Sequence, residues 1–588
     1  MSLTRRELIQ YGLTASGALL LPLQFPNKAL ADVTSASATS PTTTPWASFT
    51  TPLTFPKVLQ PYNSDDEFDY YEIVMRKEKG RFANDPNEYE FWGYNGMFPG
   101  PTIKKRTCRQ VKVSFVNKLG KTNIGWQGCP FAEGEQLEEI KAVIHNHGMP
   151  SLPEYDGFAE DFIRPEQFKT YIYPNNRAAT FWYHDHQAAR TMRNVGMGLA
   201  GMWILQDQTE YDLNLPQGKY DAPLIFQTPP FTWIQGQEIP TPPEQPKCPP
   251  PRTYTPPTLI NGVYEPLLKV DTHKYRFRLL NSTANQIYNL VLVSYDQSTQ
   301  PVDESIIVIG TDSGLRNTAV PTEKLAFVMA DRYEIIIDFS RRQIGSRIAL
   351  VDRVDGKGDT PLIFFEVAQE VEDNSSLPLQ LRPYRPVNAE VASPNHGADE
   401  EFIFDFVGKA GCSPDDRAGS INGEVWDPDS IQAYAGLKTW QKWRLINPLP
   451  QPIHPVHIHL LDFQIVRRTD LNTHQELALP VYEKDSWKDV FYLRPKEAID
   501  IVGEFGPHVG QYMMHCHNLD HEDCDMMTSF AVFDPTGKEQ PTSPLAAPAQ
   551  NLPPGFVPKD PIYKEYSIEL TPPFPSSCAN MHVPDPGS

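Results

Sequence analysis

Hydrophobic and polar residues alternate in three short segments of the chain, as they do in strands that bury one face. The segments run from Val111 to Asn117, from Arg276 to Asn281 and from Lys442 to Asn447, and each ends in asparagine. Alternation over four to eight residues predicts a half-buried β-strand. We identify no long helical pattern, so the sequence predicts an all-β fold.

The three segments recur at intervals of about 165 residues. An Asn-Gly turn, a strong signal for a tight hairpin, precedes each of them. These turns are Asn95-Gly96, Asn261-Gly262 and Asn422-Gly423. A chance similarity among strands does not explain agreement in both position and order, so we expect a triplicated domain.

Length, composition and these intervals give the expected domain boundaries. A chain of 588 residues is too long for one hydrophobic core, and its 58 prolines and 35 glycines favour turns and β-sandwiches. We expect a first domain over residues 32–207 and a second over 208–398, which includes a proline-rich loop and a linker. The third covers 399–588, with a tail of irregular coil beyond Asp534.

Residues 1–31 have the features of an export signal. Twin arginines at positions 5 and 6 precede an apolar stretch, Tyr11 to Leu23, that is too short to span a bilayer. Ala29-Leu30-Ala31 fits a cleavage site before Asp32. We expect export by the twin-arginine pathway to the periplasm or the extracellular space. A Sec signal and an uncleaved anchor are the alternatives.

The formal net charge of −21 argues against nucleic acid or an anionic membrane surface as a partner. No apolar run after the signal is long enough to cross a membrane, so we expect no stable membrane insertion. We expect a monomer whose charge serves solubility.

Seven cysteines are consistent with an oxidising compartment. If Cys516 binds a metal, six remain, and six cysteines allow 15 disulfide connectivities among which the sequence does not choose. The six are Cys108, Cys129, Cys248, Cys412, Cys524 and Cys578.

Ten of the 15 histidines lie in four clusters, two in the first repeat and two in the third. On a strand, residues two apart point to the same face, so each His-x-His presents two imidazoles side by side. Four such pairs predict a multinuclear metal site shared by the first and third domains. The pairs are His145 and His147, His184 and His186, His457 and His459, and His515 and His517.

The segment from His515 to Met527 adds sulfur ligands. Cys516 points away from the two flanking imidazoles and is expected to bind a separate metal. Its partners would be His454, His521 and Met526. Two imidazoles, a thiolate and a weak thioether are typical of an electron-transfer copper. Zinc also accepts histidine and cysteine, but it has no use for an axial methionine.

Four motifs together resemble those of three-domain multicopper oxidases, of the bacterial laccase and bilirubin oxidase type. The similarity covers nearly the whole mature chain and includes residues 92–103, 181–186, 454–459 and 515–527. It implies three cupredoxin-like Greek-key β-sandwiches and four copper ions, one type 1, one type 2 and two type 3. In such enzymes the type 1 copper takes electrons from a small-molecule reductant, and the trinuclear cluster reduces O₂ to water.

The resemblance also implies the ligands, residue by residue. Met526 is chosen over Met527 because four residues separate it from His521, as the motif requires. The type 1 ligands would be His454, Cys516, His521 and, in the axial position, Met526. The type 2 ligands would be His145 and His457, and the type 3 ligands His147, His184, His186, His459, His515 and His517.

Asp156 and Glu522 match acidic positions of the bacterial laccases that are implicated in proton supply. Reduction of O₂ to water consumes protons, which a buried cluster must receive through positioned acids. An ordinary Asp-Gly turn and a surface glutamate are the alternative interpretations.

The electron donor is less clearly indicated. One hypothesis is a phenol, an aromatic amine or a tetrapyrrole such as bilirubin, and the other is Fe(II), Mn(II) or Cu(I). The 13 methionines form no Met-rich insert, and Pro452 stands where fungal bilirubin oxidases have tryptophan, so a laccase-like activity is favoured. A copper carrier or a nitrite reductase would not need eight cluster histidines.

Overall fold

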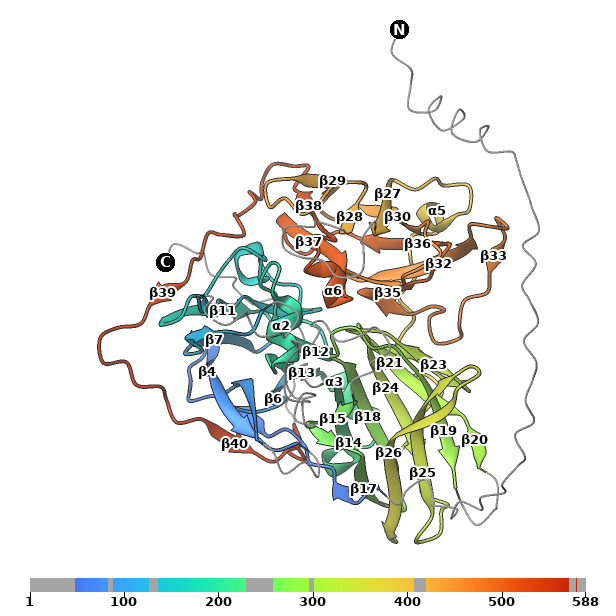
Figure 1. Cartoon of the computed structure of the whole chain (residues 1–588). Coiled ribbons are helices and arrows are strands. Elements are labelled where there is room, and N and C mark those ends of the chain that lie inside the picture. Colours follow the sequence, from blue (N-terminus) through green and yellow to red (C-terminus); the bar gives the residue numbers. More distant parts are fainter. Residues whose placement is uncertain are drawn as a thin grey trace, which may run out of the picture. The chain divides into compact units, whose positions relative to one another are not determined.

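The computed structural model describes residues 48–82, 88–125, 136–228, 257–295, 301–406 and 419–570, together with Cys578. The expected export signal and three cysteines, at positions 129, 248 and 412, lie outside the described residues. Within the described ranges, strands dominate and helices are short (Figure 1). None of the described helices has the length and apolar character needed to cross a membrane.

The first sandwich, blue to teal in Figure 1, packs two sheets around a core that includes Trp92, Phe115 and Trp203. One sheet has the order β10 (Ile144–His147), β12 (Ala179–Asp185), β13 (Ala200–Gln206), β6 (Gly100–Arg106), β2 (Val58–Gln60), β40 (Ile562–Lys564). The other has the order β3 (Asn63–Ser64), β4 (Phe68–Gly80), β7 (Gln110–Asn117), β11 (Gln167–Tyr173), β39 (Gln550–Asn551), with β5 (Tyr89–Tyr94) paired to β4.

The second sandwich, green to yellow, has Phe277, Phe327 and Phe365 in its core. One sheet has the order β1 (Thr51–Pro52), β17 (Pro266–Asp271), β26 (Gly358–Gln369), β25 (Arg347–Val354), β19 (Tyr288–Ser294), β20 (Val302–Glu304), with β23 (Leu325–Phe327) paired to β19. The other has the order β16 (Val263–Tyr264), β15 (Leu259–Ile260), β14 (Asp221–Gln227), β18 (Lys274–Asn281), β24 (Arg332–Asp338), β21 (Ile306–Thr311), β22 (Gly314–Thr322).

The third sandwich, orange to red, has Trp443, Phe463 and Phe530 in its core. One sheet has the order β28 (Gly419–Ile421), β27 (Glu400–Phe406), β30 (Trp440–Asn447), β36 (Glu497–Glu504), β32 (Phe463–Asp470), β33 (Glu476–Leu477), with β34 (Trp487–Lys488) paired to β32. The other has the order β29 (Ile431–Gly436), β38 (Met527–Phe533), β37 (Gly510–Cys516), β31 (His454–Ile458), β35 (Val490–Leu493).

Short elements complete the described chain. They are the two-stranded ribbon β8 (Lys121–Thr122) and β9 (Glu138–Glu139), the 3₁₀ turns η1 (Pro153–Tyr155) and η2 (Gly218–Tyr220), and the helices α2 (Thr191–Gly196), α3 (Gln208–Asp212), α5 (Ala389–Ala392) and α6 (Leu519–Glu522).

The structure explains both parts of the sequence repeat, which are the strands that end in asparagine and the Asn-Gly turns. The three predicted strands are β7, β18 and β30. Their terminal asparagines, Asn117, Asn281 and Asn447, are buried. Each side-chain amide donates to a backbone carbonyl in its own sandwich, and each side-chain oxygen accepts the N–H two residues further on. The polar group that ends each strand therefore has its hydrogen bonds satisfied in the same way three times.

The Asn-Gly turns also repeat in detail. Their asparagines have φ of 52–57° and their glycines 69–78°, which is the backbone of a type I′ hairpin turn. The asparagine oxygens accept backbone N–H groups of Val74, Ile225 and Ile403, so each turn is tied to a neighbouring strand. The predicted all-β fold with three sandwiches is confirmed.

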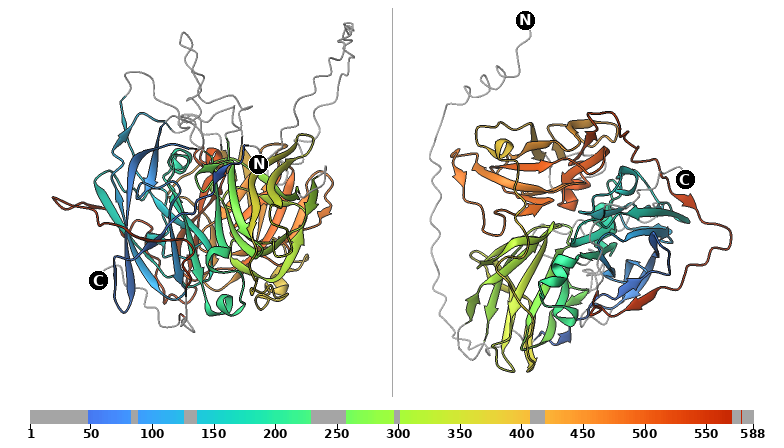
Figure 2. Two further views of the ribbon diagram at one scale, coloured as in Figure 1. Left: turned by 90° about the horizontal axis from the view of Figure 1, so that it is seen from below. Right: turned by 180° about the vertical axis from the view of Figure 1, so that it is seen from behind.

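Both ends of the described chain join sandwiches other than their neighbours in sequence. β1 pairs in parallel with β17 of the second sandwich, whereas β39 and β40 of the C-terminal tail pair with β11 and β2 of the first. Figure 2 shows the dark red tail running along the outer side of the first sandwich. The expectation of coil beyond Asp534 is wrong at these two strands, because open edges of the first sandwich offer them backbone partners. The boundaries near residues 207 and 398 stay a prediction.

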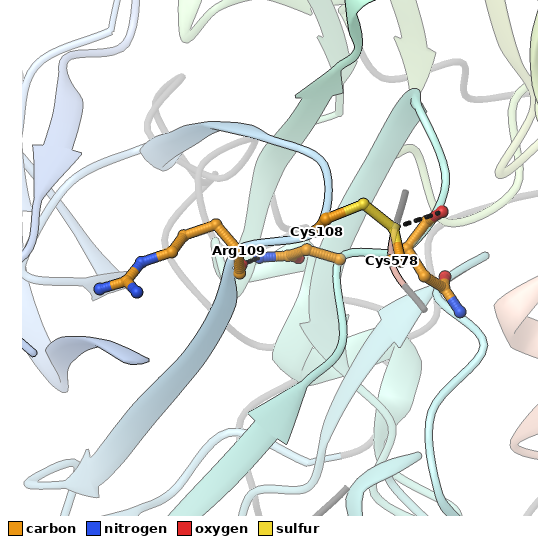
Figure 3. The surroundings of a disulfide bond; sticks show 5 residues. Cys108, Arg109 and Cys578 are labelled. Atoms are coloured by element: carbon orange, nitrogen blue, oxygen red, sulfur yellow. Dashed lines mark hydrogen bonds between the residues drawn. A yellow bond between two sulfur atoms is a disulfide. The ribbon is translucent and has the colours of Figure 1, made fainter. Parts of the chain in front are cut away.

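A disulfide ends this tail. Cys578 is bonded to Cys108, which directly precedes Arg109 and β7 of the first sandwich, across a sequence separation of 470 residues (Figure 3). Cys524 is also disulfide-bonded. Because it closes a very long loop, the Cys108–Cys578 bond restricts the unfolded chain strongly.

One apolar cluster joins all three sandwiches. It combines Trp182 and Met192 of the first, Leu280 of the second and Val490 and Leu519 of the third. Close by, the carboxylate of Asp523 accepts the backbone N–H groups of Thr191 and Met192 at the start of α2, at 2.8 and 3.1 Å. These contacts fix the first sandwich against the third, where their histidines lie.

We expect the substitution Cys578→Ser to lower the free energy of unfolding by about 2–4 kcal/mol, because the unfolded chain regains the entropy that the disulfide removes. The measurement is urea unfolding of metal-free protein, followed by tryptophan fluorescence. An unchanged unfolding midpoint would mean that strand pairing alone holds the tail.

Candidate metal centre

Adjacent strands bring the predicted histidines together within each sandwich. In the first, β10 pairs with β12 so that His145 lies opposite His184. In the third, β31 pairs with β37 so that His457 lies opposite His515. The remaining histidine of each pair lies two residues along, on the same face of the chain.

The two sandwiches then place these eight imidazoles against one another, all of them buried. Nε2 of His145 lies 3.3 Å from Nε2 of His457, and Nε2 of His186 lies 3.0 Å from Nε2 of His515. Ligand atoms within 4.8 Å of one another form three groups of histidines alone, which are His145 with His457 and His459, His147 with His184 and His517, and His186 with His459 and His515. A fourth group at the cluster joins His147 and His457 with Asp489.

In most of these imidazoles Nδ1 has a partner behind the ring, which leaves Nε2 for the cluster. The Nδ1 atoms of His145, His184 and His457 contact backbone oxygens at 2.5, 2.8 and 2.9 Å. Those of His459 and His515 contact the carboxylates of Asp156 and Glu522, at 2.7 and 3.1 Å. Such contacts orient a metal-binding imidazole and fix its tautomer.

His147 is oriented the other way round. Its Nε2 lies 3.2 Å from Oδ1 of Asp489, and its Nδ1 has no hydrogen-bond partner in the described part of the chain. The same holds there for Nε2 of His184 and for both nitrogens of His517. A buried polar atom without a partner is costly, and a metal ion bound by one nitrogen of each of these three imidazoles would remove most of that cost.

The protonation states also suit a metal. Burial, followed by the charges of neighbouring imidazoles, holds the pKa of His145, His184 and His517 well below the usual range. Burial likewise lowers the pKa of His186 to about 4. These rings are neutral at physiological pH, the form in which histidine binds metals.

The two predicted proton donors lie at the edge of the imidazole cluster and have opposite pKa shifts. Burial raises the pKa of Asp156 well above its usual range. Burial also raises the pKa of Glu522, but its interaction with the nearby imidazoles of His515 and His186 outweighs burial and lowers that pKa to about 2. The structure brings both carboxylates to the imidazoles, so neither is a surface residue.

On the other face of β37, Cys516 forms a separate group with two histidines. Its Sγ lies 3.6 Å from Nδ1 of His454 and 3.5 Å from Nδ1 of His521. It is the one free cysteine among the described residues. Burial raises the pKa of its thiol, so a bound cation is needed for the thiolate to form at neutral pH.

The two methionines that follow lie in different surroundings. Met526 is fully buried in the core cluster that contains Cys516, and its backbone oxygen accepts the N–H of Cys516 at 3.1 Å. Met527 packs in another cluster, beside Trp426 and Met513. A mixed thiolate, imidazole and thioether donor set fits copper rather than zinc or a hard cation.

Sequence reasoning missed three residues next to the cluster. Trp182 stacks on His184 with ring centroids 4.0 Å apart. Asp185 turns its carboxylate away from the cluster and accepts the N–H groups of Val143 and Gln187. Asp185 could have been found from its position between two histidines, and Trp182 from its place in the Phe-Trp-Tyr-His motif. No sequence signal singles out Asp489.

Comparison with known proteins agrees with this geometry. Two multicopper oxidase family profiles match residues 383–536 and residues 77–137 with 135–210. A laccase of Bacillus subtilis is 31% identical over 524 residues, covering 83% of this chain and 99% of the laccase. A bilirubin oxidase of Albifimbria verrucaria is 31% identical over 507 residues, covering 82% of this chain and 81% of the bilirubin oxidase. The crystal structure of a laccase from Pediococcus acidilactici superposes with a TM-score of 0.65 at 24% identity, covering 82% of this chain and 94% of that laccase.

Proposed function

Because the chain belongs to the multicopper oxidase family, we propose that it oxidises a small organic reductant at a type 1 copper and reduces O₂ to water at a trinuclear copper cluster. One observation carries this proposal. Cys516, the last residue of β37, lies between His515 and His517 in the chain, with its sulfur in the mononuclear group and the two imidazoles in the cluster. Bound copper supplies the one-electron chemistry at both places.

The proposed ligands follow the groups described above. The type 1 copper would be held by His454, Cys516 and His521, with Met526 as the axial ligand. The type 2 copper would be held by His145 and His457. The two type 3 coppers would be held by His147, His184 and His517, and by His186, His459 and His515. Support comes from the close approach of the ligand atoms of the histidines and Cys516, and from the packing of Met526 in the core cluster that contains Cys516.

Cys516 would carry electrons from one site to the other. Cα atoms two residues apart on an extended strand are separated by only roughly 7 Å, and here the backbone joins them covalently. The buried core around Cys516 keeps water away from this path.

Asp156, whose pKa is raised, would hold a proton for the oxygen chemistry, and Glu522, whose pKa is lowered, would accept protons and pass them on. Four protons are consumed for each O₂ reduced to water, and no bulk water reaches imidazoles that are buried to this extent. Asp156 contacts His459, and Glu522 contacts His515, and these two imidazoles belong to the same metal group. Two carboxylates behind different imidazoles can move protons to different positions of the same reaction.

We further propose that the electron donor is an organic molecule, such as a phenol, an aromatic amine or a tetrapyrrole. Support comes from the relatives with about 30% identity, which are named laccase and bilirubin oxidase. A metal oxidase that takes Fe(II), Mn(II) or Cu(I) is the alternative. The absence of a Met-rich segment from the sequence counts against Cu(I).

Substitutions at the type 1 site test the proposal. Cys516→Ser should abolish both the intense blue absorption of the thiolate–copper bond and turnover. Met526→Leu should keep the colour and raise the reduction potential, because loss of a weak axial donor disfavours Cu(II). Met527→Leu is the matched control and should change neither colour nor potential. An unchanged or lower potential in Met526→Leu would contradict the axial assignment.

Amide substitutions test the proton role. Glu522→Gln and Asp156→Asn should each slow reoxidation of the reduced enzyme by O₂ about 100-fold or more, since each removes a positioned acid. Stopped-flow absorption measures this step, and anaerobic reduction of the type 1 copper is the control. Equal slowing of both half-reactions would point to damage at the copper sites instead.

The electron donor is tested by steady-state rates with a phenol, bilirubin and Fe(II), measured side by side on fully copper-loaded protein. We expect the highest kcat/KM for one of the two organic donors. The highest kcat/KM for Fe(II) would favour the metal oxidase.

A further inference from the structure

The second sandwich contributes no histidine to the metal groups found among the described residues, yet one of its arginines reaches their edge. Arg332, at the start of β24, is fully buried. Its Nη1 and Nη2 donate to Oδ1 and Oδ2 of Asp489, at 2.7 and 2.5 Å. This two-pronged ion pair joins the second sandwich to the third, because Asp489 lies between β34 and β35.

Asp489 contacts two histidines that face each other across the first and third sandwiches. Its Oδ1 lies 3.2 Å from Nε2 of His147, and its backbone oxygen lies 2.9 Å from Nδ1 of His457. The two rings stack with centroids 3.6 Å apart. One residue thus contacts imidazoles from both halves of the cluster.

Arg332 is itself held rigidly. Its remaining N–H groups donate to the backbone oxygens of Thr180, Ala330 and Asp312, at 3.1, 3.0 and 3.2 Å. All five guanidinium donors therefore have an acceptor. Thr180 belongs to β12, the strand that carries His184. The guanidinium is fixed from the second sandwich and from the strand of another cluster histidine.

The chain next to His147 leaves no space for this pair to move. A Cβ at Gly148 would lie 2.7 Å from both Nη2 of Arg332 and Oδ2 of Asp489, and the backbone there has a φ of +88°. Only glycine fits this position without displacing the ion pair. The close approach brings the backbone after His147 against the carboxylate that contacts its ring.

The direction of the contact decides which nitrogen of His147 is free. A carboxylate accepts a hydrogen bond, so Nε2 carries the proton and Nδ1 is left unprotonated. His147 forms one group with His184 and His517, and Nδ1 is its nitrogen without a hydrogen-bond partner in the described part of the chain. Without a charge partner the buried Asp489 carboxylate would be strongly unfavourable, and Arg332 is the partner that keeps it in place.

We propose that Arg332 and Asp489 are positioning residues that fix His147 with Nδ1 toward the metal group it forms with His184 and His517. The second sandwich then sets the copper affinity of a cluster to which it gives no ligand. This inference rests on the proposed function, since it assumes that the group binds copper.

Arg332→Lys tests the inference while keeping the charge. A lysine ammonium has three donors and no fork, so it cannot bond both carboxylate oxygens and three backbone oxygens. We expect the cluster copper to bind about 10- to 100-fold more weakly, as loss of an outer partner typically causes. The blue type 1 absorption should stay, because Cys516, His454 and His521 form a separate group on the other face of β37.

The measurement is copper retained per chain during titration of the loaded protein with a chelator, with the type 1 absorption followed in the same samples. Arg468→Lys is the matched control. Arg468 is equally buried and forms an equivalent fork on Glu483, with two contacts of 2.9 Å, in the third sandwich. The Arg468→Lys variant should retain cluster copper as the wild-type protein does.

Selective loss of cluster copper in Arg332→Lys supports the inference. Retention as tight as in wild type, or equal loss in Arg468→Lys, overturns it. If Arg332→Lys does not fold, Asp489→Asn takes its place, and retention of cluster copper by that variant also overturns the inference. Wild-type protein that binds no copper would instead contradict the proposed function, while leaving the Arg332–Asp489 ion pair as observed.

Discussion

The burial of eight imidazoles between the first and third sandwiches is the constraint on which the site depends. Five of their nitrogen atoms have no hydrogen-bond partner within the described ranges. A metal ion takes one nitrogen from each imidazole, so it can satisfy one on each of His147, His184 and His517. At about 1–3 kcal/mol for each unsatisfied group, metal binding would remove a cost of roughly 3–9 kcal/mol, which is comparable to the net stability of a domain. The fold and the copper cluster are therefore expected to stabilise each other, so that chelation would weaken the interface between the two sandwiches.

The second sandwich has a role in this arrangement although it carries no cluster histidine in the described chain. Its apolar residues join the cluster that includes Trp182 and Val490. Its buried Asp312 forms ion pairs with Arg332 and with Lys488 of the third sandwich. Of the three similar sandwiches, the second supplies no ligand among its described residues and instead supports the other two. The C-terminal tail, bonded through Cys578, ties the end of the third sandwich to the first.

The strands, the turns and the histidine pairs were predictable from the sequence, because they repeat along the chain or follow from strand geometry. The alternating segments and Asn-Gly turns predict the strands, since each uses the same hydrogen bonds three times. The His-x-His pairs share a face because the strand period is two. Asp489 and Arg332 are different. They lie far from every motif, and their closeness arises from the packing of separate sandwiches, which no local pattern records. The pairing of β39 and β40 with the first sandwich is unpredictable for the same reason.

The most direct test of the account is a count of the metal in purified protein after copper loading, combined with electron paramagnetic resonance of the same sample. The account predicts four copper ions per chain, of which two give a signal and two are silent because they are magnetically coupled in the type 3 pair. Zinc in place of copper, or a single copper without the coupled pair, would contradict it.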